Sequence, residues 1–157
     1  MFDPSGFVKG WSIEHAAHVL EARDIHNFCI NAGGDIVLRG APGPNESWRV
    51  GIRHPDDRDA LATVVTGAGP LAIATSALYE RGAHIIDPRT GQPSIELASV
   101  TIVGPDLGTA DGYATAAFVM GLYGLETRPG YDAYIITRDD TTHWTPGFAR
   151  FRSDHTT

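Results

Sequence analysis

The sequence has few of the residues that build several familiar classes of protein. Its 157 residues include one cysteine, Cys29, which excludes an internal disulfide framework and a cysteine-rich zinc module. We expect Cys29, inside an apolar run, to be a buried small hydrophobe. No apolar run approaches the roughly 20 residues of a membrane-spanning helix, so no membrane span is expected. The 12 basic residues are dispersed and outnumbered by 19 acidic ones, which argues against binding to nucleic acid.

What the sequence has in quantity is apolar side chains, glycine and proline. Hydrophobic residues make up 42% of the chain, which is too much for a disordered protein and suits one compact domain. The 18 glycines and 10 prolines predict many tight turns. We assign residues 1–152 to this domain and 153–157 to a frayed tail. No secretion signal follows Met1, so we expect a cytoplasmic protein, or an exported one if a preceding segment carries a signal.

Hydrophobic periodicity predicts two main helices and a series of short strands. The helices are expected over about 5–22 and from a cap at Thr109 to about Met120. The runs 61–66 and 71–75 resemble a hairpin, and 131–137 with roughly 144–151 resembles another. The remaining predicted strands are 28–30, 36–38, 48–52, 84–86 and 97–103. Because the elements do not alternate as strand, helix, strand, we expect an α+β fold with a mainly antiparallel sheet.

A glycine pair, Gly33 and Gly34, follows the first predicted strand and precedes Asp35. A dinucleotide-binding Rossmann fold would place a helix directly after such a pair, whereas a strand follows here, which argues against that fold. Two interpretations remain. The bare backbone of a hairpin could admit a flat ring or a phosphate, or the segment is a plain turn, since Gly-Gly and Gly-Asp are common turn dipeptides.

Asp111 and Thr115 are separated by one helical turn in the second predicted helix, so they share a face. A carboxylate and a hydroxyl are oxygen ligands of the kind that Mg²⁺ accepts, usually with substrate phosphates completing its coordination. A cap at Thr109 would also place Asp111 in the first turn, where the helix dipole favours an anion. The alternative is an ordinary acidic residue and an ordinary helical threonine.

Two further segments carry candidate residues, each with an ordinary structural alternative. His84 begins a β-branched strand and could act as an acid or base near neutral pH, or it is simply a histidine of an edge strand. Near the N-terminus, Gly6 could expose its carbonyl to a ligand and Lys9 could meet a phosphate. The alternative there is a plain helix entry.

The order and spacing of these segments resemble the ApbE family of FAD:protein FMN transferases. The resemblance runs from residue 2 to about 137, and its motifs are 3–10 (Asp-Pro-Ser-Gly-Phe-Val-Lys-Gly), 31–35, 48–52 before Pro55, 74–76, 84–91 and 110–115. It implies an α+β fold and an enzyme that cleaves FAD between its phosphates in a Mg²⁺-dependent step. Such an enzyme transfers FMN to a threonine hydroxyl of an acceptor flavoprotein and releases AMP. Some members hydrolyse FAD to FMN and AMP instead or as well.

Carried over by position, the resemblance also implies site residues. The Mg²⁺ ligands would be Asp111, Thr115 and the backbone carbonyl of Gly6. His84 and Asp111 would be the catalytic residues, with His84 assisting the loss of a proton from the acceptor threonine. The residues implied to contact FAD are Asp3, Lys9, Gly33, Gly34, Asp35, Ser76, His84, Ile85 and Ile86.

Family members usually carry a region of roughly a hundred residues before the first motif. The resemblance therefore implies that this chain corresponds to the C-terminal portion of the family fold. The expected partners are FAD, an acceptor flavoprotein, and either a second copy of the chain or the missing N-terminal half. The alternative function is that of a remnant that binds FAD, or hydrolyses it, without attaching flavin to a protein.

Overall fold

The structure is a computed structural model that describes residues 4–57, 59–78, 85–122 and 129–152. Its helices are α1 (Ser5–Glu21), α3 (Leu107–Met120) and the 3₁₀ helix η2 (Pro146–Phe151). Its strands are β1 (Phe28–Ala32), β2 (Asp35–Arg39), β3 (Trp48–Arg53), β4 (Leu61–Gly67), β5 (Leu71–Ala77), β6 (Ile86–Asp87), β7 (Gln92–Pro93), β8 (Leu97–Gly104), β9 (Asp132–Thr137) and β10 (Thr142–Trp144).

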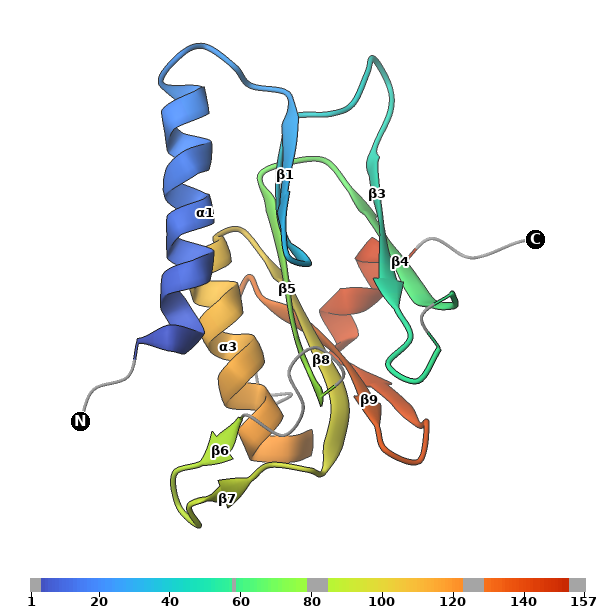
Figure 1. Cartoon of the computed structure of the whole chain (residues 1–157). Helices are drawn as coiled ribbons and strands as arrows, with labels where there is room; N and C mark the ends of the chain where they lie inside the picture. The colour runs from blue at the N-terminus through green and yellow to red at the C-terminus, as the bar shows by residue number, and fades with distance from the viewer. Residues whose placement is uncertain (1–3, 58, 79–84, 123–128, 153–157) are drawn as a thin grey trace.

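A six-stranded sheet with the order β1-β2-β5-β8-β9-β10 forms the centre of the molecule. All of the strand pairs in the described residues are antiparallel, which confirms the predicted α+β class. Helices α1 and α3 cover one face, and the β3–β4 hairpin and η2 lie over the other (Figure 1). Strand β8, which is buried along its whole length, lies near the middle of the sheet.

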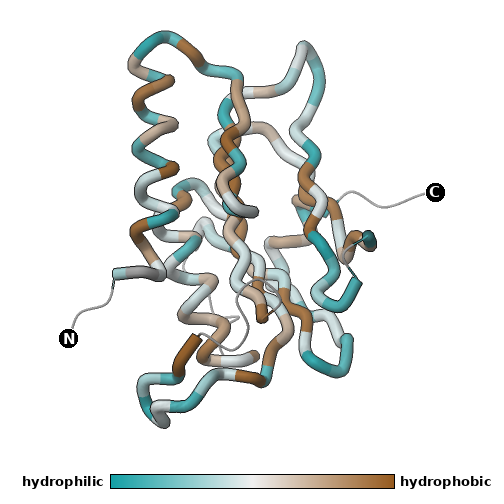
Figure 2. The backbone as a smooth tube through the Cα atoms, viewed as in Figure 1, coloured by the Kyte–Doolittle hydropathy of each residue, from teal (hydrophilic) through white to brown (hydrophobic). Residues whose placement is uncertain are grey.

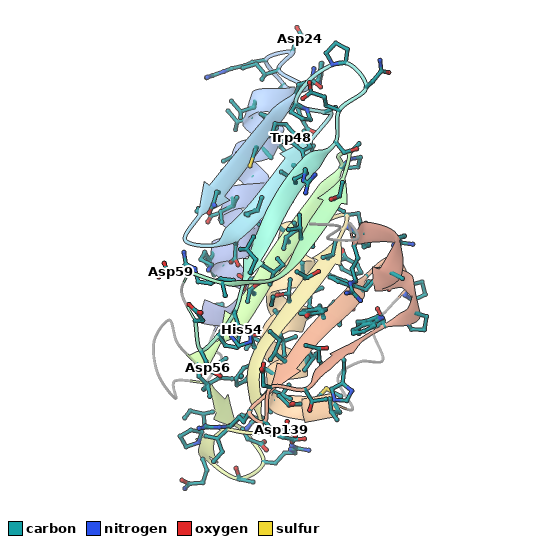
Figure 3. The ribbon with its side chains drawn as sticks, turned by 90° about the vertical axis from the view of Figure 1, so that its right-hand side faces the viewer. Asp24, Trp48, His54, Asp56, Asp59 and Asp139 are labelled. Carbon is teal, nitrogen blue, oxygen red and sulfur yellow. The ribbon has the colours of Figure 1, made fainter. Side chains whose placement is uncertain are left out.

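The sheet therefore separates two hydrophobic cores. The core under the helices joins Ile13 and Phe118 to the inward side chains of the sheet, such as Val100. The core under the β3–β4 hairpin contains Val65 and Phe148, with Trp48 packed at its margin. Figure 3 looks onto this second face, with the helices behind the sheet. Along α1, apolar and polar segments alternate (Figure 2), and several of its apolar side chains are exposed.

The predicted pairing of 61–66 with 71–75 is wrong. Strand β4 pairs with β3, whereas β5 pairs with β2 and β8 inside the main sheet. The segment between β4 and β5 passes from one sheet to the other, and the Gly69 N–H donates to the Gly40 carbonyl at 2.8 Å. A Cβ at Gly69 would lie 2.5 Å from the Arg39 Cα, so the glycine permits this crossing rather than a tight hairpin.

Two other expectations also need correction. The closing hairpin forms, but its second strand ends at Trp144, because Pro146 has no N–H to donate and opens η2 instead. Cys29 is exposed rather than buried. The reason is that β1 is an edge strand whose burial alternates, with Phe28 and Ile30 facing the core and Cys29 facing outward.

Candidate functional site

Helices α1 and α3 contact each other through residues that are four positions apart on each helix. The Leu107 N–H, at the start of α3, donates to Glu14 Oε2 at 2.9 Å. One turn earlier on α1, the Gly10 N–H donates to Asp111 Oδ2 at 2.9 Å. From one contact to the next, the residue number decreases on α1 and increases on α3, so the two helices run antiparallel here. Each turn of α1 is thereby matched to one turn of α3.

A third contact continues the same series. A Cβ at Gly6 would lie 3.2 Å from Thr115 Oγ1, so the α1 backbone lies directly against this threonine. Ser76 on β5 places its Oγ 3.5 Å from the same hydroxyl. A Cβ at Gly112 would lie 3.9 Å from the Gly6 carbonyl oxygen. The backbone of Gly6 and the side chains of Ser76 and Thr115 therefore meet at one place between the helices and the sheet.

Glycine at position 10 is a steric requirement of this arrangement. A Cβ there would lie 2.5 Å from the Leu107 carbonyl oxygen and 2.7 Å from the Asp111 Cβ. Real Cβ atoms do not approach backbone this closely, so any other residue would force the helices apart. Only glycine lets the backbone N–H reach the carboxylate.

The Asp111 carboxylate is buried, with 8% of the residue exposed. Burial raises its pKa above the ordinary aspartate value, and the bond from the Gly10 N–H opposes this rise. The negative charge of Asp35 raises the pKa further, while the positive charge of Lys9 lowers it. The charged form of Asp111 is therefore costly in the chain alone, and a cation beside it would relieve that cost.

Lys9 and Asp35 form an ion pair next to Asp111. The Lys9 Nζ lies 2.7 Å from Asp35 Oδ2, and Asp35 is 1% exposed. The Thr75 N–H donates to the other oxygen, Oδ1, at 3.3 Å. The ion pair holds Oδ2, which has no hydrogen-bond partner among the described residues, and the Thr75 N–H holds Oδ1. A buried carboxylate and a cation therefore lie side by side next to the turn of the β1–β2 hairpin.

The predicted glycine turn forms the tip of that hairpin. Gly33 and Gly34 have positive φ angles of 63° and 91°, a conformation that side chains with a Cβ rarely adopt. The Gly34 N–H donates to Asn31 Oδ1 at 3.1 Å. A Cβ at Gly33 would have no neighbour within 4 Å, so the backbone there is open. Contact with a flavin at this turn stays a prediction.

Other predicted residues are placed differently or not described. Asp3 and His84 lie outside the described residues. Ile85 is buried at 7% exposure, and its carbonyl accepts from the Ser94 N–H. Ile86, the next residue, is 48% exposed on β6. The two isoleucine side chains therefore have different surroundings, and their role along a cofactor stays a prediction.

The expectation that Asp111 lies in the first turn of its helix is wrong. Helix α3 begins at Leu107, and Asp106 is the residue that caps it, its Oδ1 accepting from the Thr109 N–H at 2.7 Å. Asp111 is the fifth helical residue, beyond the strongest reach of the helix dipole. The group that holds its carboxylate is instead the Gly10 N–H of the other helix.

Sequence patterns alone missed Gly10, Glu14 and Arg39. Glu14 and Arg39 are buried at 5% and 6% exposure and form an ion pair. One local signal was available, because Gly6 and Gly10 are four residues apart on one helix face, as are Gly108 and Gly112. Such spacing is typical of helices that pack closely. Nothing local linked Glu14 to Arg39, which is 25 residues away in sequence.

The candidate metal ligands are one carboxylate, one hydroxyl and one backbone carbonyl. In the part of the chain that the structure describes, no group of three or more His, Cys, Asp or Glu side chains is arranged to hold a metal. A site of Asp111, Thr115 and the Gly6 carbonyl therefore does not suit a metal that requires an all-protein cage. It does suit Mg²⁺, which retains water and takes phosphate ligands from its substrate.

The chain is similar to known proteins over most of its length. The model of the ApbE family matches residues 1–134, a segment that contains Gly6, Asp111 and Thr115. The chain belongs to the ApbE family. A relative from Klebsiella pneumoniae, named FAD:protein FMN transferase, is 34% identical over 164 residues, covering 95% of this chain and 47% of its own. One of the same name from Vibrio cholerae is 36% identical, covering 76% of this chain and 38% of its own.

Solved ApbE structures share the fold. The ApbE protein from Thermotoga maritima superposes with a TM-score of 0.87 at 28% identity, over 98% of this chain and 54% of that one. The flavin transferase ApbE from Vibrio cholerae gives a TM-score of 0.81 at 31% identity, over 94% and 51%. The chain thus spans about half the length of the ApbE proteins it matches.

Among the helices that the structure describes, none combines the length and the apolar character needed to cross a membrane.

Proposed function

We propose that this chain acts in the Mg²⁺-dependent transfer of FMN from FAD to a threonine hydroxyl of an acceptor flavoprotein, with release of AMP. The names of its relatives support flavin transfer. The observation that carries the proposal is the contact of α3 with α1, in which Thr115 lies against the Gly6 backbone and Asp111, one turn away, is bonded to the Gly10 N–H. Asp111, Thr115 and Gly6 carry the oxygen donors that the motifs imply, and they come from two elements about a hundred residues apart in sequence.

Gly6, Asp111 and Thr115 would hold the cation. When bound, Mg²⁺ would offset negative charge on the pyrophosphate of FAD and on the departing phosphate of AMP. The raised pKa of Asp111 supports this assignment, because a carboxylate whose charged form is disfavoured by burial gains most from a cation.

The other residues of the site would position the reactants. In the reaction, the bond between the FMN phosphorus and the bridging oxygen breaks, and a bond from the threonine oxygen to that phosphorus forms. The Gly10 N–H fixes the orientation of Asp111, and Lys9 supplies a positive charge near the same carboxylate. Such transfers depend mainly on alignment and on stabilisation of charge. His84 is our candidate for taking the proton of the threonine hydroxyl.

The test is to incubate the chain with FAD, Mg²⁺ and a threonine-containing acceptor. AMP is measured by chromatography, and attached FMN is measured by mass spectrometry of the acceptor. Asp111→Ala should abolish both products. Asp106→Ser is the matched control, because it removes another carboxylate of α3 while keeping a residue that caps the helix. Unchanged AMP release in Asp111→Ala would refute the metal assignment.

A second candidate function is the binding or hydrolysis of FAD without transfer to a protein. It is favoured by one observation, that the chain spans about half the length of its relatives. In the same assay, AMP without a labelled acceptor would identify hydrolysis. Binding of FAD without AMP would leave a flavin-binding protein. Association with a second copy, or with a polypeptide matching the other half of the relatives, is the condition under which we expect the transfer activity.

A further inference from the structure

We propose that Glu14 is a positioning residue that sets the register of α1 against α3. By doing so it would fix how far the Gly6 carbonyl lies from the side chains of Asp111 and Thr115. The part of this inference that concerns the metal rests on the proposed function. The part that concerns the register rests on contacts within the chain alone.

Glu14 caps α3 from a different helix. Leu107 is the first residue of α3, so its N–H is one of the groups at a helix start that have no partner within the helix. That N–H donates to Glu14 Oε2 at 2.9 Å, and the contact is buried. One turn of α1 is thereby tied to one defined end of α3.

The other oxygen of Glu14 is anchored to the sheet. The guanidinium of Arg39, on β2, donates to Glu14 Oε1, and a second nitrogen of Arg39 donates to Glu21 Oε1 at 2.7 Å. The exposed ring of His18 lies 3.7 Å from Glu14 Oε1. Glu14 therefore connects α1, α3 and β2 at one buried point, whereas Glu21 shares Arg39 but does not reach α3.

The rest of the helix contact consists of backbone, small residues and apolar packing, such as the Phe7 ring against Gly108 and Gly112. Of the three contacts in register, only that of Glu14 uses a side chain of α1, since Gly10 and Gly6 contribute backbone. Sliding by one turn is a shift of about 5.4 Å, and it would move Asp111 from the Gly10 N–H to the level of Gly6. Small residues allow the helices to approach closely, and Glu14 supplies the contact that selects one register.

Glu14→Gln tests this role with little change of shape. A carboxylate accepts on both oxygens, whereas an amide accepts on one and donates from the other. The glutamine must therefore lose either the Leu107 N–H or the Arg39 guanidinium as a partner. Glu21→Gln is the matched control, because it also weakens a bond to Arg39 and leaves the cap of α3 intact.

The first measurement is Mn²⁺ binding to the full chain, followed by electron paramagnetic resonance, with Mn²⁺ as the probe for the Mg²⁺ site. Asp111→Ala identifies the signal that belongs to the site. Loss of a residue that orients metal ligands typically weakens metal binding 10- to 100-fold, so we expect about a 10-fold higher Kd in Glu14→Gln and an unchanged Kd in Glu21→Gln.

The second measurement needs no metal. Amide hydrogen exchange of the Gly10 and Leu107 N–H groups should be faster in Glu14→Gln than in Glu21→Gln. A double variant, Glu14→Leu with Arg39→Met, replaces both charges of the buried pair by apolar side chains. Because neither charge is left unpaired, this variant is expected to fold even if a single substitution does not. It should still show fast exchange at Gly10 and weak Mn²⁺ binding.

The outcomes separate the two proposals. If Mn²⁺ binds in an Asp111-dependent way but with the same Kd in Glu14→Gln and in the control, the role of Glu14 is refuted and the metal site stands. If no Asp111-dependent binding exists in the unsubstituted chain, the proposed metal site fails, and with it the effect of Glu14 on that site. Unchanged exchange at Gly10 in both Glu14 variants would refute the register itself.

Discussion

The two faces of the six-stranded sheet are packed with different chemistry. Under the helices, the apolar core is interrupted by buried charged groups, and glycines line the contact between α1 and α3. Under the β3–β4 hairpin, the core is dominated by aliphatic and aromatic side chains, with Tyr134 stacked on Phe148 at 5.3 Å between ring centroids. Burying charge disfavours folding unless it is paired, whereas burying apolar area favours it.

This difference indicates that one face mainly stabilises the fold and the other mainly holds the candidate site. The hairpin face contributes stability, because Phe148 and its neighbours remove apolar surface from water, and the buried carboxylate on this face, Asp132, is bonded by Thr145 and Arg150. On the helical face, Asp35 is paired with Lys9, and Asp111 accepts from the Gly10 N–H. Buried carboxylates of this kind suit a reactive site better than they suit a stabilising core. The variants below test this comparison, from the largest expected effect to the smallest.

The largest effect on stability is expected on the hairpin face. Phe148→Ala should lower the free energy of unfolding by about 3–5 kcal/mol, because it leaves a cavity in a fully buried aromatic cluster. Chemical denaturation measures this loss. Phe151→Ala, at the half-buried margin of the same cluster, should cost less. If the folded fraction of Phe148→Ala also lost Asp111-dependent Mn²⁺ binding, the inferred separation of roles between the two faces would be wrong.

Next is a substitution at the helix contact. Gly10→Ala should abolish AMP release and lower the free energy of unfolding by about 1–3 kcal/mol, because the added Cβ would meet backbone of α3. Gly112→Ala is the matched control: its Cβ would have its nearest neighbour at 3.8 Å, and alanine favours a helix by up to about 1 kcal/mol. Equal effects of the two alanines on AMP release would contradict the steric argument.

A smaller effect of opposite sign is expected at Asp111. Burial raises the pKa of Asp111, so the folded chain holds this proton more tightly than the unfolded chain does. The stability of the metal-free chain should then fall as the pH rises from the ordinary aspartate pKa of 3.8 through the raised value. Asp111→Asn lacks this titration and can still accept from the Gly10 N–H. It should therefore melt at a higher temperature than the unsubstituted chain at pH 7.

Thermal melts over a pH series, without metal, measure this difference. The advantage of Asp111→Asn should shrink as the pH falls from the raised pKa of Asp111 to 3.8 and should be lost below 3.8, where the carboxyl is protonated in both the folded and the unfolded chain. An advantage that stays constant with pH would mean that burial of the charge is not its cause. The same variant should lose Mn²⁺ binding, which would separate function from stability at one position.

The smallest effect concerns a charge on the hairpin side. Arg150, which is largely exposed, donates to Asp132 Oδ2 at 2.9 Å, while Thr145 Oγ1 donates to the other oxygen at 2.7 Å. Arg150→Met should lower the free energy of unfolding by about 1 kcal/mol, because the buried carboxylate of Asp132 loses its exposed partner but keeps the bond from Thr145, and by less in high salt, with AMP release unchanged. A larger loss would show that this face also depends on electrostatics.

Local pattern was sufficient for most of the fold. The helix expected over 5–22 is Ser5–Glu21, and the strand expected over 97–103 is Leu97–Gly104, because both are specified by the spacing of their own apolar residues. The partner of β4 was not predictable in this way. Its apolar residues suit any neighbouring strand, and the choice of β3 over β5 depends on which surfaces the whole sheet must cover.

In the candidate site, the sequence predicted the residues that belong to recognisable motifs but not the contacts that support them. Asp111 and Thr115 could be paired by helical spacing, and Thr115 lies against the Gly6 backbone, while the shared role of the three residues as metal ligands stays a prediction. The part played by Gly10 was not visible, because its contribution is a backbone N–H and a missing side chain. Glu14 and Arg39 come together only after α1 packs on the sheet, so no local rule joins them.

The outward-facing thiol of Cys29 gives this chain a ready attachment point. It is the one cysteine in the sequence, and it lies on the edge strand of the sheet. A maleimide dye would therefore label a single known position without any substitution. Partial burial raises the pKa of the Cys29 thiol, so labelling should proceed faster in mildly alkaline buffer. Fluorescence from that dye would then report any polypeptide that adds to the open edge of β1.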